Sequence, residues 1–340
     1  MSKTITAETP VHTLAGQTIT DTGSRIASID IIRAITMVLM IFVNDLWSLT
    51  NIPVWLLHTT RDQDGMGLSD AIFPGFLFIV GMSIPFAIRN RRKKGDNQGQ
   101  LVLHILVRSA ALLIMGVFLV NGDNLNATAT GMPRLLYYTI VCTSFILIWN
   151  AYPKTAKPAL VWGVRALGIV ALIALAFQVR GGEQAVGFTT YWWGILGLIG
   201  WSYLVCSLIF IFLGHNLVAM TASWIVLISL SMASRADLIS FGFMDFVMDP
   251  LSAGSLPFLT TGGILVSMIY LHFRGKGQEK KMLTILGIFA AVMFAAGFYT
   301  NKFWIIAKLG ATPPWVLICS GITIVTFMLI YWLADMKNKA

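Results

Sequence analysis

Charged residues are scarce in this chain of 340 residues: Asp, Glu, Lys and Arg make up 11% of it, whereas 56% is hydrophobic. A soluble globular domain carries about 25% charged residues. The composition therefore excludes an ordinary soluble fold and predicts an all-α protein that crosses a membrane many times. The net charge of +9 sits in short tracts between apolar runs, where Lys and Arg fix topology, so we expect no nucleic-acid partner.

Cysteine is also rare. Cys142, Cys206 and Cys319 each lie inside an apolar run, and none has a CxxC neighbour. This pattern supports neither a zinc site nor a disulfide framework, so we expect no metal. Residues 1–24 lack the apolar core of a signal peptide. We expect them to form a polar, mobile tail that precedes a single transmembrane domain over residues 25–340.

Long apolar runs recur along the rest of the chain. A helix needs about 20 residues to cross the hydrocarbon core of a bilayer. Pro74 and Pro85 should bend the second run, because each removes a backbone donor. Runs near the spanning length predict about ten transmembrane helices, at residues 31–50, 70–88, 101–120, 134–151, 158–178, 193–213, 216–234, 255–273, 282–300 and 314–334.

The basic residues indicate how these helices are oriented. With the N-terminus inside, the cytoplasmic segments hold 15 Lys and Arg, five of them in the tract RNRRKK at 89–94, and the outer segments hold six. Cytoplasmic loops are enriched in Lys and Arg. We therefore expect both termini in the cytoplasm.

Polar residues gather where the first two expected helices approach the outer surface. Asn44 and Asp45 end an apolar run, and a lone His58 follows in the next loop. A polar residue at membrane depth is unfavourable and marks a functional site by default. Since a histidine accepts protons near neutral pH and a carboxylate can hold its tautomer, His58 is either an exposed loop residue or a catalytic base. Three more carboxylates occur in the same stretch: Asp62, Asp64 and Asp70.

Cationic residues occur near the inner ends of the first and third expected helices. Arg33 follows Asp30 by three residues, so the two can pair on one helix face. His104 and Arg108 are four residues apart and also share a face. These cations either extend towards the inner headgroups or form a basic pocket for an anionic cofactor.

The segment YWWGILGLIGW combines aromatic residues with spaced glycines. Gly194, Gly197 and Gly200 predict close packing against another helix. Trp192 and Trp193 fit either an interfacial aromatic belt or a surface on which sugar rings stack.

Residues 25–88 combine these features into one pattern. It consists of Ser-x-Asp-x-x-Arg, an apolar helix that ends in Val-Asn, a loop histidine, then Asp-x-x-Phe-Pro and Gly-x-Ser-Ile. The segments RIASIDIIRAITMVLMIFVND and GLSDAIFPGFLFIVGMSIPFAI carry it. The pattern resembles heparan-α-glucosaminide N-acetyltransferase and its bacterial relatives. Weaker similarity to the same family occurs in the segments VRSAALLIMGVFLVN, WWGILGLIGW and NKFWIIAKLGATPPWVL.

The resemblance implies the transfer of an acetyl group from cytosolic acetyl-CoA to the amino group of a glucosamine or related glycan beyond the membrane. It implies that His58 is the active histidine and Asn44 its partner, and we group the adjoining Asp45 with them. It also implies an integral protein of a bacterial inner membrane. Relatives often carry an arginine where this chain has Tyr138, in PRLLYYT.

The geometry of the first helix suits a donor that enters from inside. Fourteen residues separate Asp30 from Asn44, or about 21 Å of helix, which an extended pantetheine arm could follow. The inner cations Arg33, His104 and Arg108 would then face its phosphates. The outer carboxylates and tryptophans would bind a cationic acceptor: Asp62, Asp64, Asp70, Trp192 and Trp193.

A carrier for a sugar or amino sugar is the alternative. Carriers place polar residues near the midplane of related halves, whereas here they gather at the outer mouth and no internal repeat is evident. The sequence thus favours the enzyme. The acetyl group passes either directly between substrates or through an acylated His58, and we expect the direct route. The sequence leaves open whether the protein forms a homodimer.

Overall fold

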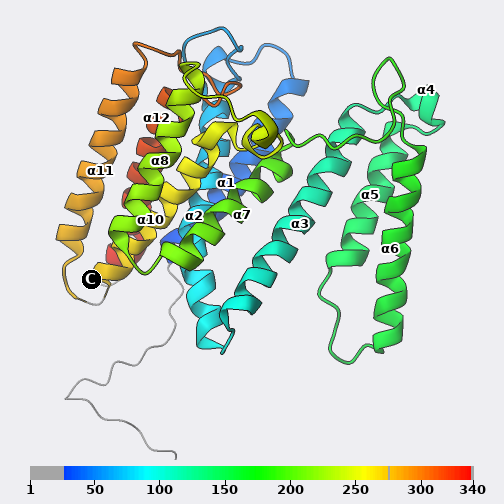
Figure 1. The fold of residues 1–340 in the computed structure, drawn as a ribbon, viewed down its shortest axis with the longest axis horizontal. Helices are drawn as coiled ribbons and strands as arrows, with labels where there is room; N and C mark the ends of the chain where they lie inside the picture. The colour runs from blue at the N-terminus through cyan, green and yellow to red at the C-terminus, as the bar shows by residue number, and fades with distance from the viewer. Residues whose placement is uncertain (1–26, 275, 338–340) are drawn as a thin grey trace, which may run out of the picture.

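A computed structural model of the protein describes residues 27–274 and 276–337. Within these ranges the fold is a bundle of helices without a β-sheet, as predicted (Figure 1). The expected tail at 1–24 lies outside the described residues. The long helices are α1 (Ala27–Asp45), α2 (Leu68–Lys93), α3 (Gln98–Asp123), α5 (Arg134–Trp149), α6 (Pro158–Gln178), α7 (Ile195–Leu213), α8 (Leu217–Arg235), α10 (Ser255–Phe273), α11 (Glu279–Thr300) and α12 (Pro313–Tyr331).

Every expected span coincides with one of these helices. Within the described residues, nine helices are long and apolar enough to cross a membrane, which is consistent with a polytopic membrane protein. The tenth, α5, has 16 residues, or about 24 Å of helix. It lies beside α6 and leads from α4 (Ala127–Thr130) to the loop before α6, which continues towards the opposite end of the bundle (Figure 1).

The two described ends of the chain lie together, which requires an even number of passes. The backbone N–H of Ser28 in α1 donates to Asp335 Oδ2 at 3.1 Å, and Asp335 belongs to the short helical extension Trp332–Met336 that follows α12. With nine passes these ends would be on opposite faces, so α5 completes the count of ten. Which face is cytoplasmic stays a prediction.

Helices α2, α10 and α12 form the buried centre of the bundle. The closest approach is between α2 and α10. A Cβ atom at Gly81 would overlap the carbonyl oxygen of Thr260, and one at Gly263 would overlap that of Phe78. Small residues let membrane helices pack backbone to backbone, so these two glycines fix the distance between the central helices.

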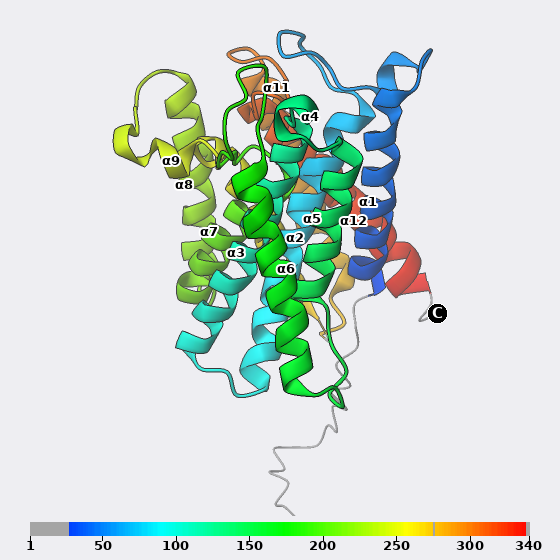
Figure 2. The ribbon, with the colours of Figure 1, turned by 90° about the vertical axis from the view of Figure 1, so that its right-hand side faces the viewer.

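The predicted glycine packing of α7 is confirmed, with α3 as its partner. A Cβ atom at Gly194 would overlap Val120, and one at Gly116 on α3 would reach the Gly197 nitrogen at 2.5 Å. This contact sets the start of α7 beside the end of α3. Figure 2 shows that the loop before α7 and the segment around α9 (Asp245–Met248) lie towards the same end of the bundle as the loop after α1.

Both prolines of α2 lie inside a continuous helix of 26 residues. Pro74 has no N–H to offer to the carbonyl of Asp70 four residues earlier. The indole Nε1–H of Trp315 on α12 donates to that carbonyl oxygen at 3.1 Å instead. A neighbouring helix thus satisfies the acceptor that the proline leaves free, as membrane helices require.

We expect Gly263→Ala to destabilise the protein by about 1–3 kcal/mol, because the added methyl group meets the α2 backbone and forces the central helices apart. Thermal unfolding in detergent measures this. Gly163→Ala on α6 is the matched control, since a Cβ atom there meets nothing within 4 Å. Equal unfolding temperatures for the two variants would contradict the packing described for α2 and α10.

Candidate functional site

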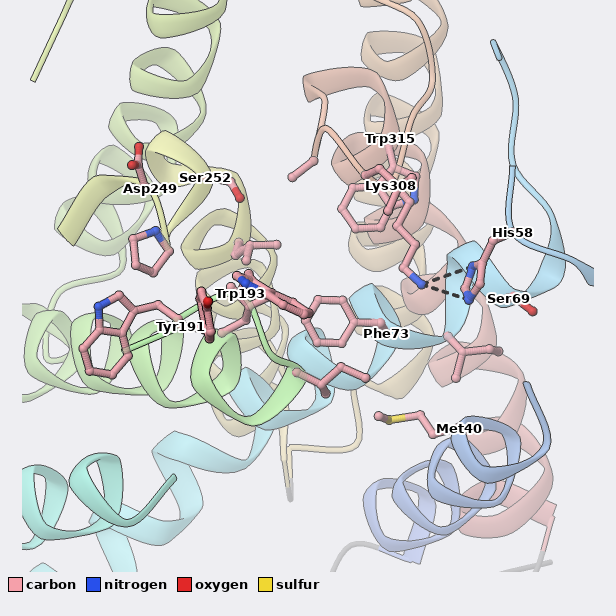
Figure 3. Close-up of a pocket in the computed structure, with 18 of the residues that line it drawn as sticks. Met40, His58, Ser69, Phe73, Tyr191, Trp193, Asp249, Ser252, Lys308 and Trp315 are labelled. Atoms are coloured by element: carbon pink, nitrogen blue, oxygen red, sulfur yellow. Dashed lines mark hydrogen bonds between the residues drawn. The ribbon is translucent and has the colours of Figure 1, made fainter. Parts of the chain in front are cut away.

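A cavity of about 560 Å³ opens at the end of the bundle where α1 ends and α2, α7, α10 and α12 begin. Four of the residues singled out from the sequence line it: Asn44, His58, Trp192 and Trp193. Figure 3 shows His58 and Lys308 on one side of the cavity and Asp249 on the other, with Phe73 and Trp193 between them. The site therefore joins the end of α1 to loops that are far apart in the sequence.

The imidazole of His58 is hydrogen-bonded to the carboxylate of Asp70. The imidazole Nδ1 lies 2.7 Å from Asp70 Oδ1, and the Asp70 side chain is fully buried whereas that of His58 is 41% exposed. A buried carboxylate accepts the Nδ1–H and fixes that tautomer. The Nε2 atom is then the nitrogen that offers a lone pair to a ligand, which is the arrangement of a histidine that acts as a base.

Asp70 also fixes the loop that carries the histidine. Its Oδ2 atom accepts hydrogen bonds from the backbone N–H groups of Thr59 and Gly67 and from the Thr59 hydroxyl, each at 3.0 Å. A Cβ atom at Gly67 would overlap the carbonyl oxygen of Leu57. Because Asp70 is the third residue of α2, one carboxylate caps the helix and holds both sides of the loop at once.

Lys308, in the loop between α11 and α12, lines the cavity and was not singled out by the sequence analysis. Its Nζ lies 3.2 Å from Nδ1 and 3.4 Å from Nε2 of His58. Burial lowers the pKa of the ammonium, while the nearby Asp70 carboxylate acts in the opposite direction. The only sequence signal was a lone lysine inside the apolar stretch WIIAKLGATPP on the side expected to be poor in positive charge.

The loops of His58 and Lys308 are clamped together by Asp64. Asp64 Oδ1 accepts the N–H of Ile306 at 2.7 Å, and Oδ2 accepts a hydrogen bond from the Asn301 amide at 3.3 Å. The N–H of Gly65 donates to the carbonyl of Ile306 at 3.0 Å. Asp64 is not among the cavity-lining residues, so its carboxylate positions the loops rather than facing the cavity.

A second clamp holds the aromatic wall of the cavity, which consists of Tyr191, Trp192 and Trp193. The amide of Asn121, buried on α3, donates to the carbonyl of Thr189 at 2.8 Å and accepts the N–H of Thr189 at 3.1 Å. The chain then continues into the lining residues Tyr191, Trp192 and Trp193. Trp192 packs edge to face on Phe246, whose ring centroid is 5.8 Å away. The aromatic wall is therefore fixed at both of its ends.

The remaining predicted residues do not line the cavity. Asp45 and Asp62 are exposed and do not line it. Arg33 makes the expected ion pair with Asp30 at 3.1 Å and also donates to the Ser83 hydroxyl at 2.9 Å.

The other two inner cations, His104 and Arg108, lie near each other on α3, and Arg108 stacks 5.2 Å above the ring centroid of Tyr203. None of the three inner cations lines the cavity. Their role in binding phosphate stays a prediction.

Removing the Asp64 carboxylate should loosen the Lys308 loop without unfolding the bundle. A hydrogen bond to a charged group contributes about 1.5–3 kcal/mol, so in Asp64→Ala the Ile306 amide should exchange its hydrogen about ten- to a hundredfold faster. Hydrogen exchange read by mass spectrometry measures this. Asp62→Ala is the control, because Asp62 is an equally exposed carboxylate of the same loop and makes no hydrogen bond to residues 301–312. Unchanged exchange at residues 301–312 in Asp64→Ala would show that the clamp does not hold the loop.

Comparison with known proteins finds similarity over the first third of the chain. The family model described as "Heparan-alpha-glucosaminide N-acetyltransferase, catalytic" matches residues 25–125. The human protein named heparan-alpha-glucosaminide N-acetyltransferase is 31% identical over 101 residues, which are 28% of this chain and 14% of that protein. Its mouse counterpart is 30% identical over 103 residues, 29% of this chain and 14% of its own length.

The matched region contains Asn44, His58 and Asp70, whereas Lys308 and the aromatic wall lie beyond it. The match covers a small part of each relative's length, so it speaks for this region alone. Residues 25–125 match the catalytic region of the heparan-alpha-glucosaminide N-acetyltransferase family, which confirms the resemblance predicted from the pattern around Asn44 and His58.

Proposed function

We propose that the protein is a membrane N-acyltransferase that moves an acetyl group from acetyl-CoA to the amino group of an amino sugar. The observation that carries the proposal is the pairing of His58 with the buried Asp70 at the edge of a cavity that Asn44 also lines. The family match over residues 25–125 supports it, because the matched relatives are named as N-acetyltransferases of glucosaminide.

His58 is the base of the proposed reaction. With Nδ1–H donated to Asp70, Nε2 faces the substrates and takes a proton from the attacking amine. Proton transfer of this kind contributes about 10²- to 10⁴-fold to a rate. Asp70 keeps the imidazole oriented and stabilises the imidazolium that forms, so its role is to position His58 rather than to bind the acceptor.

Asn44 is the proposed partner for the acyl carbonyl. Its side chain lines the cavity and takes part in no hydrogen bond with another described residue. An amide N–H aimed at the carbonyl oxygen stabilises the negative charge that develops there when the amine attacks. In this proposal the partner of the polar group at the end of α1 is the bound acyl donor.

The rest of the cavity suits a sugar. Its volume of about 560 Å³ lies within the usual range of small-molecule sites, about 300–1,000 Å³. Phe73 and Trp193 offer flat apolar surfaces, and Asp249 with Ser252 offers oxygen atoms to hydroxyl groups on the far side (Figure 3). The acceptor lies across this wall with its amino group towards His58.

Acetyl-CoA is proposed to reach the cavity from the opposite end of the bundle. Eleven residues of α1 separate Arg33 from Asn44, or about 17 Å of helix, a span that an extended pantetheine arm can cover. Arg33, His104 and Arg108 would hold the phosphates at that end. The donor end is then the cytoplasmic face, with the protein in a bacterial inner membrane.

The carrier alternative gains no support from this arrangement. The polar cavity residues lie at the ends of α1, α2 and α12 and in the adjoining loops. A carrier would place them near the middle of the bundle on broken helices.

The decisive test is His58→Ala in the purified protein, with acetyl-CoA and glucosamine as substrates. We expect formation of N-acetylglucosamine to fall by about 10²- to 10⁴-fold, while binding of CoA and the unfolding temperature stay close to the parent values. The matched control is His215→Ala, in the turn between α7 and α8 at the far end of the bundle. Activity of His58→Ala within a factor of two of the parent would exclude His58 as the base.

The sidedness of the reaction is tested separately. In a variant without native cysteines, Cys introduced at Asn97 should resist an impermeant thiol reagent in intact cells and react after permeabilisation, because it follows the basic tract at 89–94. Cys introduced at Asp62 should react in intact cells. The reverse result would place the cavity in the cytoplasm and remove the need for transfer across the membrane.

A further inference from the structure

We propose that Lys308 is a further catalytic residue of this transfer: its ammonium group protonates the departing thiolate of CoA and is then recharged by His58. The inference rests on the proposed function and extends it to a residue outside the matched region 25–125. Lys308 lines the cavity together with Asn44 and His58 and therefore lies within reach of the reacting atoms.

The contact between Lys308 and His58 provides the route for the returning proton. The ammonium nitrogen is 3.2 Å from Nδ1 and 3.4 Å from Nε2. Nδ1 already donates to Asp70 at 2.7 Å. Lys308 Nζ is nearly equidistant from the two ring nitrogens. Because Nδ1 is engaged with Asp70, we assign the proton exchange with Lys308 to Nε2, which needs a small movement of the lysine side chain into line with the Nε2 lone pair.

Lys308 is the only cation besides histidine among the residues that line the cavity, all of which belong to the described chain. Its loop is held in place over several residues. Ile306 is bound on both its N–H and its carbonyl by Asp64 and Gly65, and the N–H of Ala307 donates to the Thr312 hydroxyl at 3.0 Å. A flexible surface lysine would not need such a support.

The proton balance of the step closes within these two residues. The neutral acceptor amine attacks the acyl carbon, and a C–N bond forms. The amine nitrogen then loses a proton to Nε2 of His58. The C–S bond breaks, its electron pair stays on sulfur, and the thiolate takes a proton from Lys308. The imidazolium of His58 then returns its proton to the lysine amine, so that both side chains regain their starting charge and the products are the amide and the free thiol.

The surroundings of Lys308 suit an acid for a thiolate. The pKa of a thiol is about 8.5 and that of a free lysine about 10.4, so an ordinary lysine is a weak proton donor to sulfur. Burial lowers the pKa of Lys308 and brings it closer to that of the leaving group. A proton donor whose pKa lies closer to that of the leaving group transfers its proton more readily in the transition state.

Two acetyl donors that release different thiolates test the role of Lys308 as the acid. Acetyl-CoA releases an alkyl thiolate that gains from protonation, whereas the S-acetyl ester of an aromatic thiol releases a thiolate that leaves without it. For Lys308→Met we expect glucosamine acetylation to slow by about a hundredfold with acetyl-CoA but only a fewfold with the aryl thioester, after subtraction of the uncatalysed rate. Lys302→Met, an exposed lysine of the same loop, should change neither rate.

The pH dependence gives a second readout. Because Lys308 must be protonated to act, the rate of the parent with acetyl-CoA should fall as pH rises through the lowered pKa of Lys308. This fall should vanish in Lys308→Arg, whose guanidinium keeps its charge and donates no proton. An equal loss with both donors, or an alkaline fall that persists in Lys308→Arg, would overturn the role of Lys308. No acetyl transfer by the parent protein with either donor would overturn the proposed function itself.

Discussion

The buried carboxylate of Asp70 is the contact on which the candidate site depends. A charge taken out of water is strongly unfavourable unless donors surround it, and Asp70 receives hydrogen bonds from His58, from two backbone N–H groups and from a hydroxyl. Its own backbone carbonyl, freed by Pro74, binds Trp315 on α12. One residue thus joins the start of α2, the histidine loop and the start of α12, and the cavity forms where these three meet.

The site lies at the ends of the helices because polar backbone needs partners that lipid cannot give. Irregular segments are tolerated there when they satisfy one another, and the loops 46–67 and 301–312 do so through Asp64, Gly65 and Ile306. The same loops supply His58 and Lys308. The hydrogen bonds between these two loops therefore also bring together the side chains of His58 and Lys308, which are 250 residues apart in the sequence.

Sequence patterns predicted the parts of this structure that follow from local rules. Apolar runs of spanning length predicted all ten long helices, and the glycine spacing of α7 predicted close packing against another helix, which the structure identifies as α3. Asn44 and His58, which line the cavity, were singled out because polar residues are conspicuous beside an apolar run, and the family resemblance supplied their predicted roles. Lys308 was not found, since a lone loop lysine has no local signal and its meaning depends on a distant contact. Asp64 and Asp70 were predicted to bind the acceptor, and the sequence did not show that Asp70 is buried against His58 or that Asp64 binds the loop after α11.

The two clamps show why residues outside the cavity belong to its chemistry. Asp64 fixes the backbone that carries Lys308, and Asn121 fixes the segment that leads to Trp193. A displacement of about 1 Å can cost a hundredfold in rate when two substrates must meet in one orientation. A site whose walls come from loops gains rigidity only through such contacts. Conservation of function in related chains should therefore depend on the clamp residues Asp64 and Asn121 as well as on the residues that line the cavity.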